Sequence, residues 1–196
     1  MRGSFWLVFL SLVGPTTLAL AQGLKIPDQV DPAIKEALTQ IGASTLQQAI
    51  RQSRDEARSG ATAPIPVKIW KAVSCLYDDR KLLESVRYKI GDDGMSNVAN
   101  LSIRFGDAYA VTLIDTIVFA KKADALENVE LWAHELWHVK QFRDWGEREF
   151  ALRFVRDHRA VEADAYAAPA KNKAANKRCA GGLPYPLFDA GPSDRR

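Results

Sequence analysis

The segment His134-Glu135-Leu136-Trp137-His138 places two imidazoles and a carboxylate at the H-E-x-x-H spacing. On a helix, residues four apart lie on one face, so both imidazoles can reach a single metal ion. Glu135 would then stand beside the metal, where it can take a proton from a water molecule. The spacing predicts a Zn²⁺ site with His134 and His138 as ligands and Glu135 as the catalytic base. The alternative is a pair of core histidines satisfied by other partners.

The residues around the motif favour a helix. No Pro or Gly interrupts residues 124–145, and Gly146 stands where a helix stop is expected. Asp124 followed by Glu127 resembles a capping box, and Asn128 is a second possible start. One stripe at helical spacing holds Leu131, His134, His138, Gln141, Phe142 and Trp145. We expect a largely buried helix with both imidazoles on its inward face.

A catalytic zinc ion usually has three protein ligands, so a third must come from another element. The metzincin pattern would supply a third His shortly after the second, but Gln141 replaces its Gly and Asp144 replaces its His. The gluzincin pattern takes a Glu from a later helix instead. We therefore expect the third ligand in the segment after Gly146.

Residues 153–168 are rich in Ala and unbroken, which predicts a second helix that ends before Pro169. Glu162 and Asp164 are its candidate ligands, and we prefer Glu162 because small residues flank it. The other carboxylate would then hold an imidazole N–H from outside the ligand set. His158 and Tyr166, one turn on either side of Glu162, are candidates for stabilising an oxyanion, although both residue types are also common on helix surfaces.

The first residues have the pattern of a signal peptide. A short positive start at Met1-Arg2 precedes an apolar run over residues 5–20, and Ala19-Leu20-Ala21 forms an A-x-A site. We expect cleavage before Gln22 and a periplasmic or secreted protein. The run is too short and too interrupted to favour an uncleaved anchor, so no stable membrane insertion is expected after cleavage.

The composition fits an exported domain rather than a nucleic-acid binder. The formal net charge is only +3, and no basic stripe indicates nucleic acid as a partner. Cys75 and Cys179 are the only cysteines, and in an exported chain a disulfide between them is the first interpretation. Ligation of zinc by either Cys is a weaker alternative because no C-x-x-C pair exists.

The segments before the motif combine helices and strands. Helical periodicity covers residues 31–59, with Gly42 as a possible division, and residues 67–83 are helical or mixed. A turn is expected at residues 91–94, and strands are expected at 86–90, 101–105 and 110–119. The last of these would place a sheet edge beside the metal, where it can pair with an extended peptide, unless residues 111–119 form a buried hairpin.

These elements predict an α+β fold, a small zincin-like domain with helices around a short antiparallel sheet and an H-E-x-x-H active-site helix. We divide the chain into a signal peptide at 1–21, an N-terminal helical segment at 22–63, a metallopeptidase domain at 64–169 and a C-terminal tail at 170–196 that contains Pro and Gly.

A family resemblance rests on two segments. Thr112-Leu113-Ile114-Asp115-Thr116-Ile117-Val118-Phe119 and, after it, His134-Glu135-Leu136-Trp137-His138-Val139-Lys140-Gln141 resemble the extracellular contractile injection system core domain, a bacterial family of metallopeptidase-like domains. The resemblance covers about residues 64–142. It implies zinc held by His134 and His138, with Glu135 as the base. Ile114-Asp115 replaces the family's Gly-Asn turn, and Phe142 replaces a Gln.

The sequence thus favours an exported gluzincin-type metallopeptidase that acts on a peptide or protein substrate through metal-activated water. The alternative is an exported non-catalytic module, for zinc binding or for assembly, that retains the motif.

Overall fold

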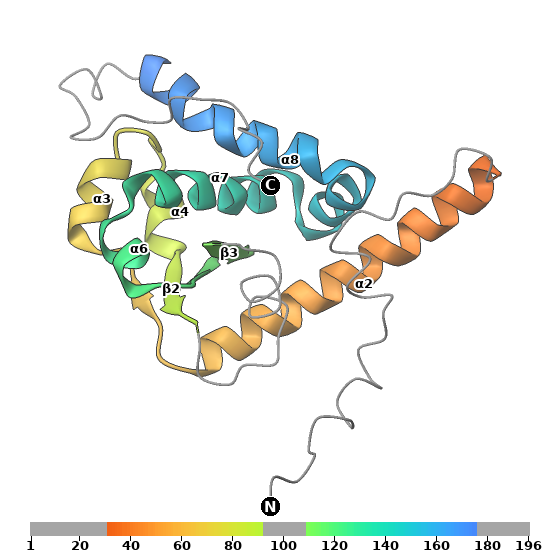
Figure 1. The fold of residues 1–196 in the computed structure, drawn as a ribbon, viewed down its shortest axis with the longest axis horizontal. Coiled ribbons are helices and arrows are strands. Elements are labelled where there is room, and N and C mark those ends of the chain that lie inside the picture. Colours follow the sequence, from red (N-terminus) through yellow and green to blue (C-terminus); the bar gives the residue numbers. More distant parts are fainter. Residues whose placement is uncertain (1–30, 92–108, 176–196) are drawn as a thin grey trace, which may run out of the picture.

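The computed structural model describes residues 31–91 and 109–175. The predicted signal peptide, the strand at 101–105, most of the turn at 91–94 and most of the C-terminal tail lie outside these residues. The described part is a mixed α/β structure in which helices surround a four-stranded sheet, as Figure 1 shows. This agrees with the predicted α+β class.

The sheet is mixed rather than antiparallel. Its strands are β1 (Ala63–Pro64), β2 (Arg87–Ile90), β3 (Ala110–Leu113) and β4 (Thr116–Phe119), in the order β1-β2-β4-β3. β1 pairs with β2 and β3 with β4 in antiparallel fashion, but β2 and β4 are parallel. The expectation of an antiparallel sheet was therefore wrong at its centre. The long chain between β2 and β3 permits the crossover that a parallel pair requires.

The predicted strand at 110–119 is the hairpin of β3 and β4, as in the alternative interpretation, and β3 is at the same time an edge strand of the described sheet. Its two-residue turn is Ile114-Asp115, and Ile114 has a φ of 62°. A β-branched residue is strained in this left-handed region, at a cost of about 1–2 kcal/mol. Two arginines hold the turn, because Asp115 pairs with Arg58 at 3.0 Å and with Arg54 at 3.9 Å.

One long helix, α2 (Pro32–Ser59), covers most of the N-terminal segment. Gly42 does not divide it, contrary to the possibility raised from the sequence. Gly42 and Ala43 are buried, and the absence of a side chain at Gly42 and the single methyl group of Ala43 suit the close packing of α2 along α8 (Glu147–Ala175). The first turns of α2, red in Figure 1, extend away from the sheet.

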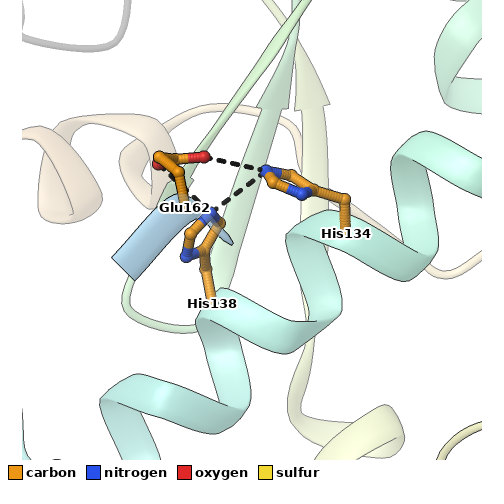
Figure 2. Close-up of side chains that lie close together, drawn as sticks. All are labelled: His134, His138 and Glu162. Atoms are coloured by element: carbon orange, nitrogen blue, oxygen red, sulfur yellow. Dashed lines mark hydrogen bonds and ion pairs between the residues drawn. The ribbon is translucent and has the colours of Figure 1, made fainter. Parts of the chain in front are cut away.

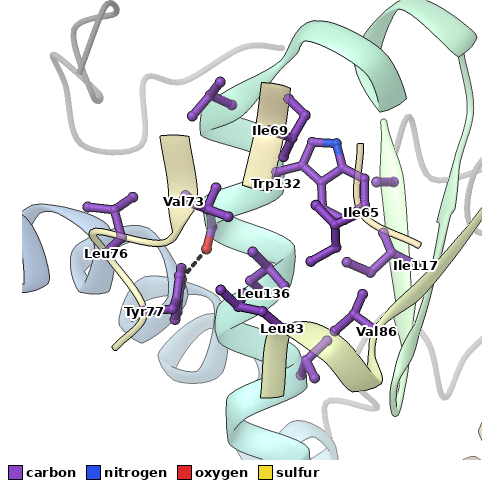
Figure 3. Close-up of a cluster of buried hydrophobic side chains, with 14 of the residues drawn as sticks. Ile65, Ile69, Val73, Leu76, Tyr77, Leu83, Val86, Ile117, Trp132 and Leu136 are labelled. Atoms are coloured by element: carbon purple, nitrogen blue, oxygen red, sulfur yellow. Dashed lines mark hydrogen bonds between the residues drawn. The ribbon is translucent and has the colours of Figure 1, made fainter. Parts of the chain in front are cut away.

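The main core lies between the sheet and the helices α3 (Val67–Val73), α4 (Arg80–Ser85), α6 (Lys122–Glu127) and α7 (Val129–Trp145), as Figure 3 shows. Trp132 of α7 is fully buried, with its ring centroid 4.7 Å from that of Phe119 and 5.5 Å from that of Tyr88. The hydroxyl of Tyr77 donates to the carbonyl of Ala133. These contacts fix α7, which carries the H-E-x-x-H motif, against the sheet.

The bounds of α7 follow one of the two starts considered. Asn128 is its N-cap, and the Asn128 side-chain oxygen accepts from the Leu131 N–H at 3.0 Å. Asp124 belongs to the separate short helix α6, so a start at Asp124 was wrong. At the other end Gly146 has a φ of 80°, which confirms the predicted stop.

The second predicted helix is part of α8, which differs from expectation in two ways. Asp157 has non-helical angles (φ −157°, ψ 84°) and divides α8, and its side chain accepts from the Ala160 N–H at 3.0 Å as a new N-cap. The helix also continues past Pro169 instead of ending before it. Pro169 is fully buried, so packing of its ring offsets the backbone hydrogen bond that proline cannot make.

Among the described residues, no helix combines the length and apolar character needed to cross a membrane.

The N-cap of α7 gives a prediction about stability. Asn128→Ala should lower the free energy of unfolding by about 1 kcal/mol, because it leaves the Leu131 N–H without its acceptor. Asn128→Ser, which keeps an oxygen at the cap, should retain most of that stability. Urea denaturation followed by circular dichroism measures both. Equal losses for the two variants would contradict the capping role.

Candidate metal centre

Two histidines of α7 face the same buried point. His134 and His138 are each 6% exposed, and their Nε2 atoms lie 3.1 Å apart. Two neutral imidazoles that both direct a lone pair toward this point would repel each other, so the arrangement needs a shared proton or a cation.

Glu162, from the second half of α8, completes the group. Its carboxylate oxygens lie 3.3 Å from the His134 Nε2 and 3.5 Å from the His138 Nε2. Figure 2 shows the carboxylate facing both rings from the opposite helix. The preferred third residue is thus brought together with both histidines, and the three ligand atoms lie within 4.8 Å of one another.

The donor atoms are close enough together to bind one metal ion. Zinc bonds to nitrogen and oxygen are about 2.0–2.1 Å long, so tetrahedral ligand atoms stand roughly 3.3 Å apart. The two Nε2 atoms lie 3.1 Å apart, close to that spacing, and each has one of the two Glu162 carboxylate oxygens at 3.3 or 3.5 Å. His134, His138 and Glu162 therefore form a buried group that can bind a metal ion.

The charges of the group support one another. Burial alone would raise the pKa of Glu162, but hydrogen bonds and charge from His134 and His138 outweigh it and hold that pKa well below its ordinary value. Burial alone would lower the pKa of His138, but the bond to Glu162 and the charges of Glu162 and Glu135 outweigh it and raise that pKa. The three side chains together therefore favour an ionised Glu162 and a positive charge between it and the two imidazoles.

Glu135, the predicted base, is held at the sheet side of α7. Its side chain is buried, and its carboxylate accepts a hydrogen bond of 2.6 Å from the hydroxyl of Thr112 on β3. β3 is the edge strand of the described sheet and packs against α7. The sequence pattern did not indicate a role for Thr112. Its one signal was a hydroxyl within a strand of apolar and β-branched residues.

Asp164, the alternative third ligand, lies outside the metal-binding group. Its carboxylate accepts from the Trp137 indole N–H at 2.7 Å and from the Gln141 amide at 3.0 Å. Asp164 thus contacts no imidazole directly, and Gln141 stands between it and His138. The helical stripe included Gln141, but nothing in the pattern indicated this role.

Tyr166 lies beside the group and His158 lies elsewhere. The Tyr166 ring centroid is 4.3 Å from that of His134, and the residue is 53% exposed. Partial burial and the charges of Glu162 and Glu135 raise its pKa. His158 instead contacts Phe154, with centroids 6.0 Å apart, and is not part of the metal-binding group.

Only one of the two cysteines predicted to form a disulfide lies among the described residues. Cys75, between α3 and α4, is disulfide-bonded. Cys179 lies outside the described residues.

These observations define a mixed α/β protein with a buried His-His-Glu group on two adjacent helices. The family model of the eCIS core domain matches residues 80–146, which confirms the resemblance noted from the sequence. The matched segment holds His134, Glu135 and His138, and also Thr112 and Gln141, but ends before Glu162. No curated protein and no solved structure matches the chain.

The group predicts which carboxylate binds metal. Glu162→Ala should lose zinc because it removes the carboxylate that faces both Nε2 atoms. Asp164→Ala should still bind one zinc ion per chain when zinc is in excess. Equilibrium dialysis with mass spectrometry measures both, beside the wild type. Zinc retained by Glu162→Ala and lost by Asp164→Ala would reverse the assignment.

Proposed function

We propose that this protein is an exported, zinc-dependent peptidase of the gluzincin type. The observation that carries the proposal is the convergence of His134, His138 and Glu162 beside Glu135. Two histidines one helical turn apart, an adjacent Glu and a Glu from a later helix are the groups that such an enzyme requires. We also propose that the fold is zincin-like.

Zinc, when bound, lowers the pKa of a water molecule toward neutrality and polarises a carbonyl group. The Nε2 atoms of His134 and His138 and the carboxylate of Glu162 are the groups that would hold it. Borderline nitrogen ligands together with one carboxylate suit zinc better than magnesium or calcium, which prefer oxygen alone.

The remaining steps fall to the protein's own side chains. Glu135 takes a proton from the attacking water and gives it to the leaving amine. The Thr112 hydroxyl donates a 2.6 Å hydrogen bond to one oxygen of the Glu135 carboxylate, which leaves the other oxygen to take the proton. Tyr166, whose ring lies beside that of His134, would donate a hydrogen bond as negative charge develops on the carbonyl oxygen.

The surroundings of the group support access by a peptide. The Glu162 side chain is 36% exposed and Tyr166 is 53% exposed, so one side of the group is open to solvent. Next to it, β3 forms an edge of the described sheet. A peptide or protein substrate can pair with such an edge in extended form, which presents its carbonyl groups in order.

Export is supported by two features of the chain. Residues 1–21 have the pattern of a cleavable signal peptide. Cys75 is disulfide-bonded, and disulfides persist mainly in oxidising compartments such as the periplasm or the extracellular space. The proposed location is therefore periplasmic or secreted.

A second candidate is an exported non-catalytic module that binds zinc or serves in assembly. The description of the matched family, which names a core domain and no reaction, favours it. Structural zinc sites, however, are usually closed by four protein ligands. The described residues supply three, and the group is open on one side, so we place the peptidase first.

The catalytic base separates the two functions. Glu135→Gln should keep zinc while peptide hydrolysis falls by about 10²–10⁴-fold, because an amide cannot accept the proton of the attacking water. Cleavage of a fluorescence-quenched random peptide library, with zinc content measured in parallel, checks this. Hydrolysis at the wild-type rate by a zinc-loaded Glu135→Gln protein would contradict the mechanism. A wild type that binds zinc and cleaves nothing would favour the non-catalytic module.

The contact between strand and base gives a further prediction. Thr112→Val keeps the shape of the side chain but removes the hydroxyl that holds Glu135. A hydrogen bond to a charged group contributes about 1.5–3 kcal/mol, so kcat should fall about tenfold or more while zinc stays bound. Thr112→Ser, which restores the hydroxyl, should recover most of the rate. If Thr112→Val matches the wild type, the hydroxyl does not orient the base.

A further inference from the structure

A chain of hydrogen bonds joins α8 to one of the two imidazoles. The Asp164 carboxylate accepts from the Gln141 Nε2 at 3.0 Å, and the Gln141 Oε1 lies 2.8 Å from the His138 Nδ1. Gln141 is 2% exposed, so water cannot readily replace either contact. We call this chain of hydrogen bonds, from Asp164 through Gln141 to His138, the relay. It reaches the Nδ1 of His138, whereas Glu162 lies near the Nε2.

The surroundings leave Gln141 one orientation. Its Nε2 donates to the Asp164 carboxylate and, at 3.3 Å, to the carbonyl of Val161. Both groups can only accept, so the amide nitrogen must face them and the amide oxygen must face His138. The indole N–H of Trp137 holds Asp164 in turn, at 2.7 Å.

The two imidazoles differ in this respect. Among the described residues, the buried Nδ1 of His134 has no hydrogen-bond partner, while the Nδ1 of His138 has the Gln141 oxygen. Because that oxygen accepts, the proton of a neutral His138 must be on Nδ1. Its Nε2 is then left with a free lone pair, which points toward His134 and Glu162.

We infer that Gln141 and Asp164 are positioning residues that set the tautomer of His138 and so prepare its Nε2 to bind the metal. The inference deepens the proposed function, because it rests on the same metal centre. Partners of this kind typically change metal affinity by about 10–100-fold when removed. Asp164 acts at a distance of two hydrogen bonds, by fixing the orientation of the Gln141 amide.

The test removes the two members of the relay in turn. Gln141→Met keeps the approximate volume but removes the acceptor, and should weaken zinc binding about 10–100-fold. Asp164→Ala removes one acceptor that fixes the Gln141 amide, and should weaken zinc binding by a smaller factor. Gln52→Met on the outer surface of α2 is the matched control.

Zinc affinity is measured on the full chain by competition with a chromophoric chelator, after circular dichroism has shown that each variant folds. ¹⁵N-histidine NMR of the zinc-depleted wild type, at a pH high enough that His138 is neutral, should place its proton on Nδ1, and Gln141→Met should produce a mixture of tautomers. A neutral His138 with its proton on Nε2 in the wild type would overturn the inference. So would wild-type zinc affinity in Gln141→Met.

Neither measurement uses hydrolysis, which separates the two proposals. If the wild type binds zinc and shows the expected tautomer but cleaves no peptide, the relay stands and the peptidase does not. If the wild type cleaves peptides and Gln141→Met binds zinc normally, the peptidase stands and the relay does not. A wild type that binds no zinc would overturn both.

Discussion

Two imidazole nitrogens held 3.1 Å apart in a buried helix interface cannot remain as facing lone pairs. The repulsion between them is relieved by a proton shared between the two nitrogens or by a cation that both bind, and the carboxylate of Glu162 lies where it favours the cation. Much of the surrounding structure bears on this constraint. It sets which residues must approach α7, how closely, and with which atoms facing inward.

The path of the chain after α7 brings Glu162 into place. Gly146, in a conformation with positive φ, lets the chain reverse, and the rings of Phe142 and Phe150 stack across the reversal with centroids 3.7 Å apart. The break at Asp157 then starts a new helical segment, capped by its own side chain. This second segment packs against α7 in a direction that the first segment does not fix, and it carries both Glu162 and Asp164. A single straight helix from Glu147 would not allow the two segments to orient independently.

Much of the centre could be predicted because its signals are local. The spacing of His134 and His138 requires only a helix, and the stop at Gly146 follows from one residue type. Glu162 was a choice between two nearby carboxylates, and the flanking small residues indicated the one that now faces the histidines. The Asn128 cap was one of two starts with similar side chains, and a sequence pattern does not separate an oxygen that reaches an N–H from one that does not.

The features that escaped prediction depend on distant partners. The parallel pairing of β2 with β4 joins segments separated by a long stretch of chain. The alternation of apolar and polar residues within a strand does not indicate which strand it pairs with. The contact of Thr112 with Glu135 exists only once β3 lies against α7. Pro169 continues a helix because its ring is buried, whereas local preference alone predicts a stop. Local rules failed where tertiary packing supplied a larger energy.

The two-residue turn at Ile114-Asp115 also governs what kinds of sequence change the protein can tolerate. In the hairpin, Leu113 pairs with Thr116 and Thr112 with Ile117, and successive side chains point to opposite faces. Substitution within the turn changes local strain and, at Asp115, the ion pairs with Arg54 and Arg58, but it leaves the register of the strands unchanged. Insertion or deletion of a single residue in β3 would instead exchange the faces of the strand, turning Thr112 away and presenting an apolar neighbour to Glu135. The turn of this hairpin therefore tolerates a change of residue better than the strand tolerates a change of length.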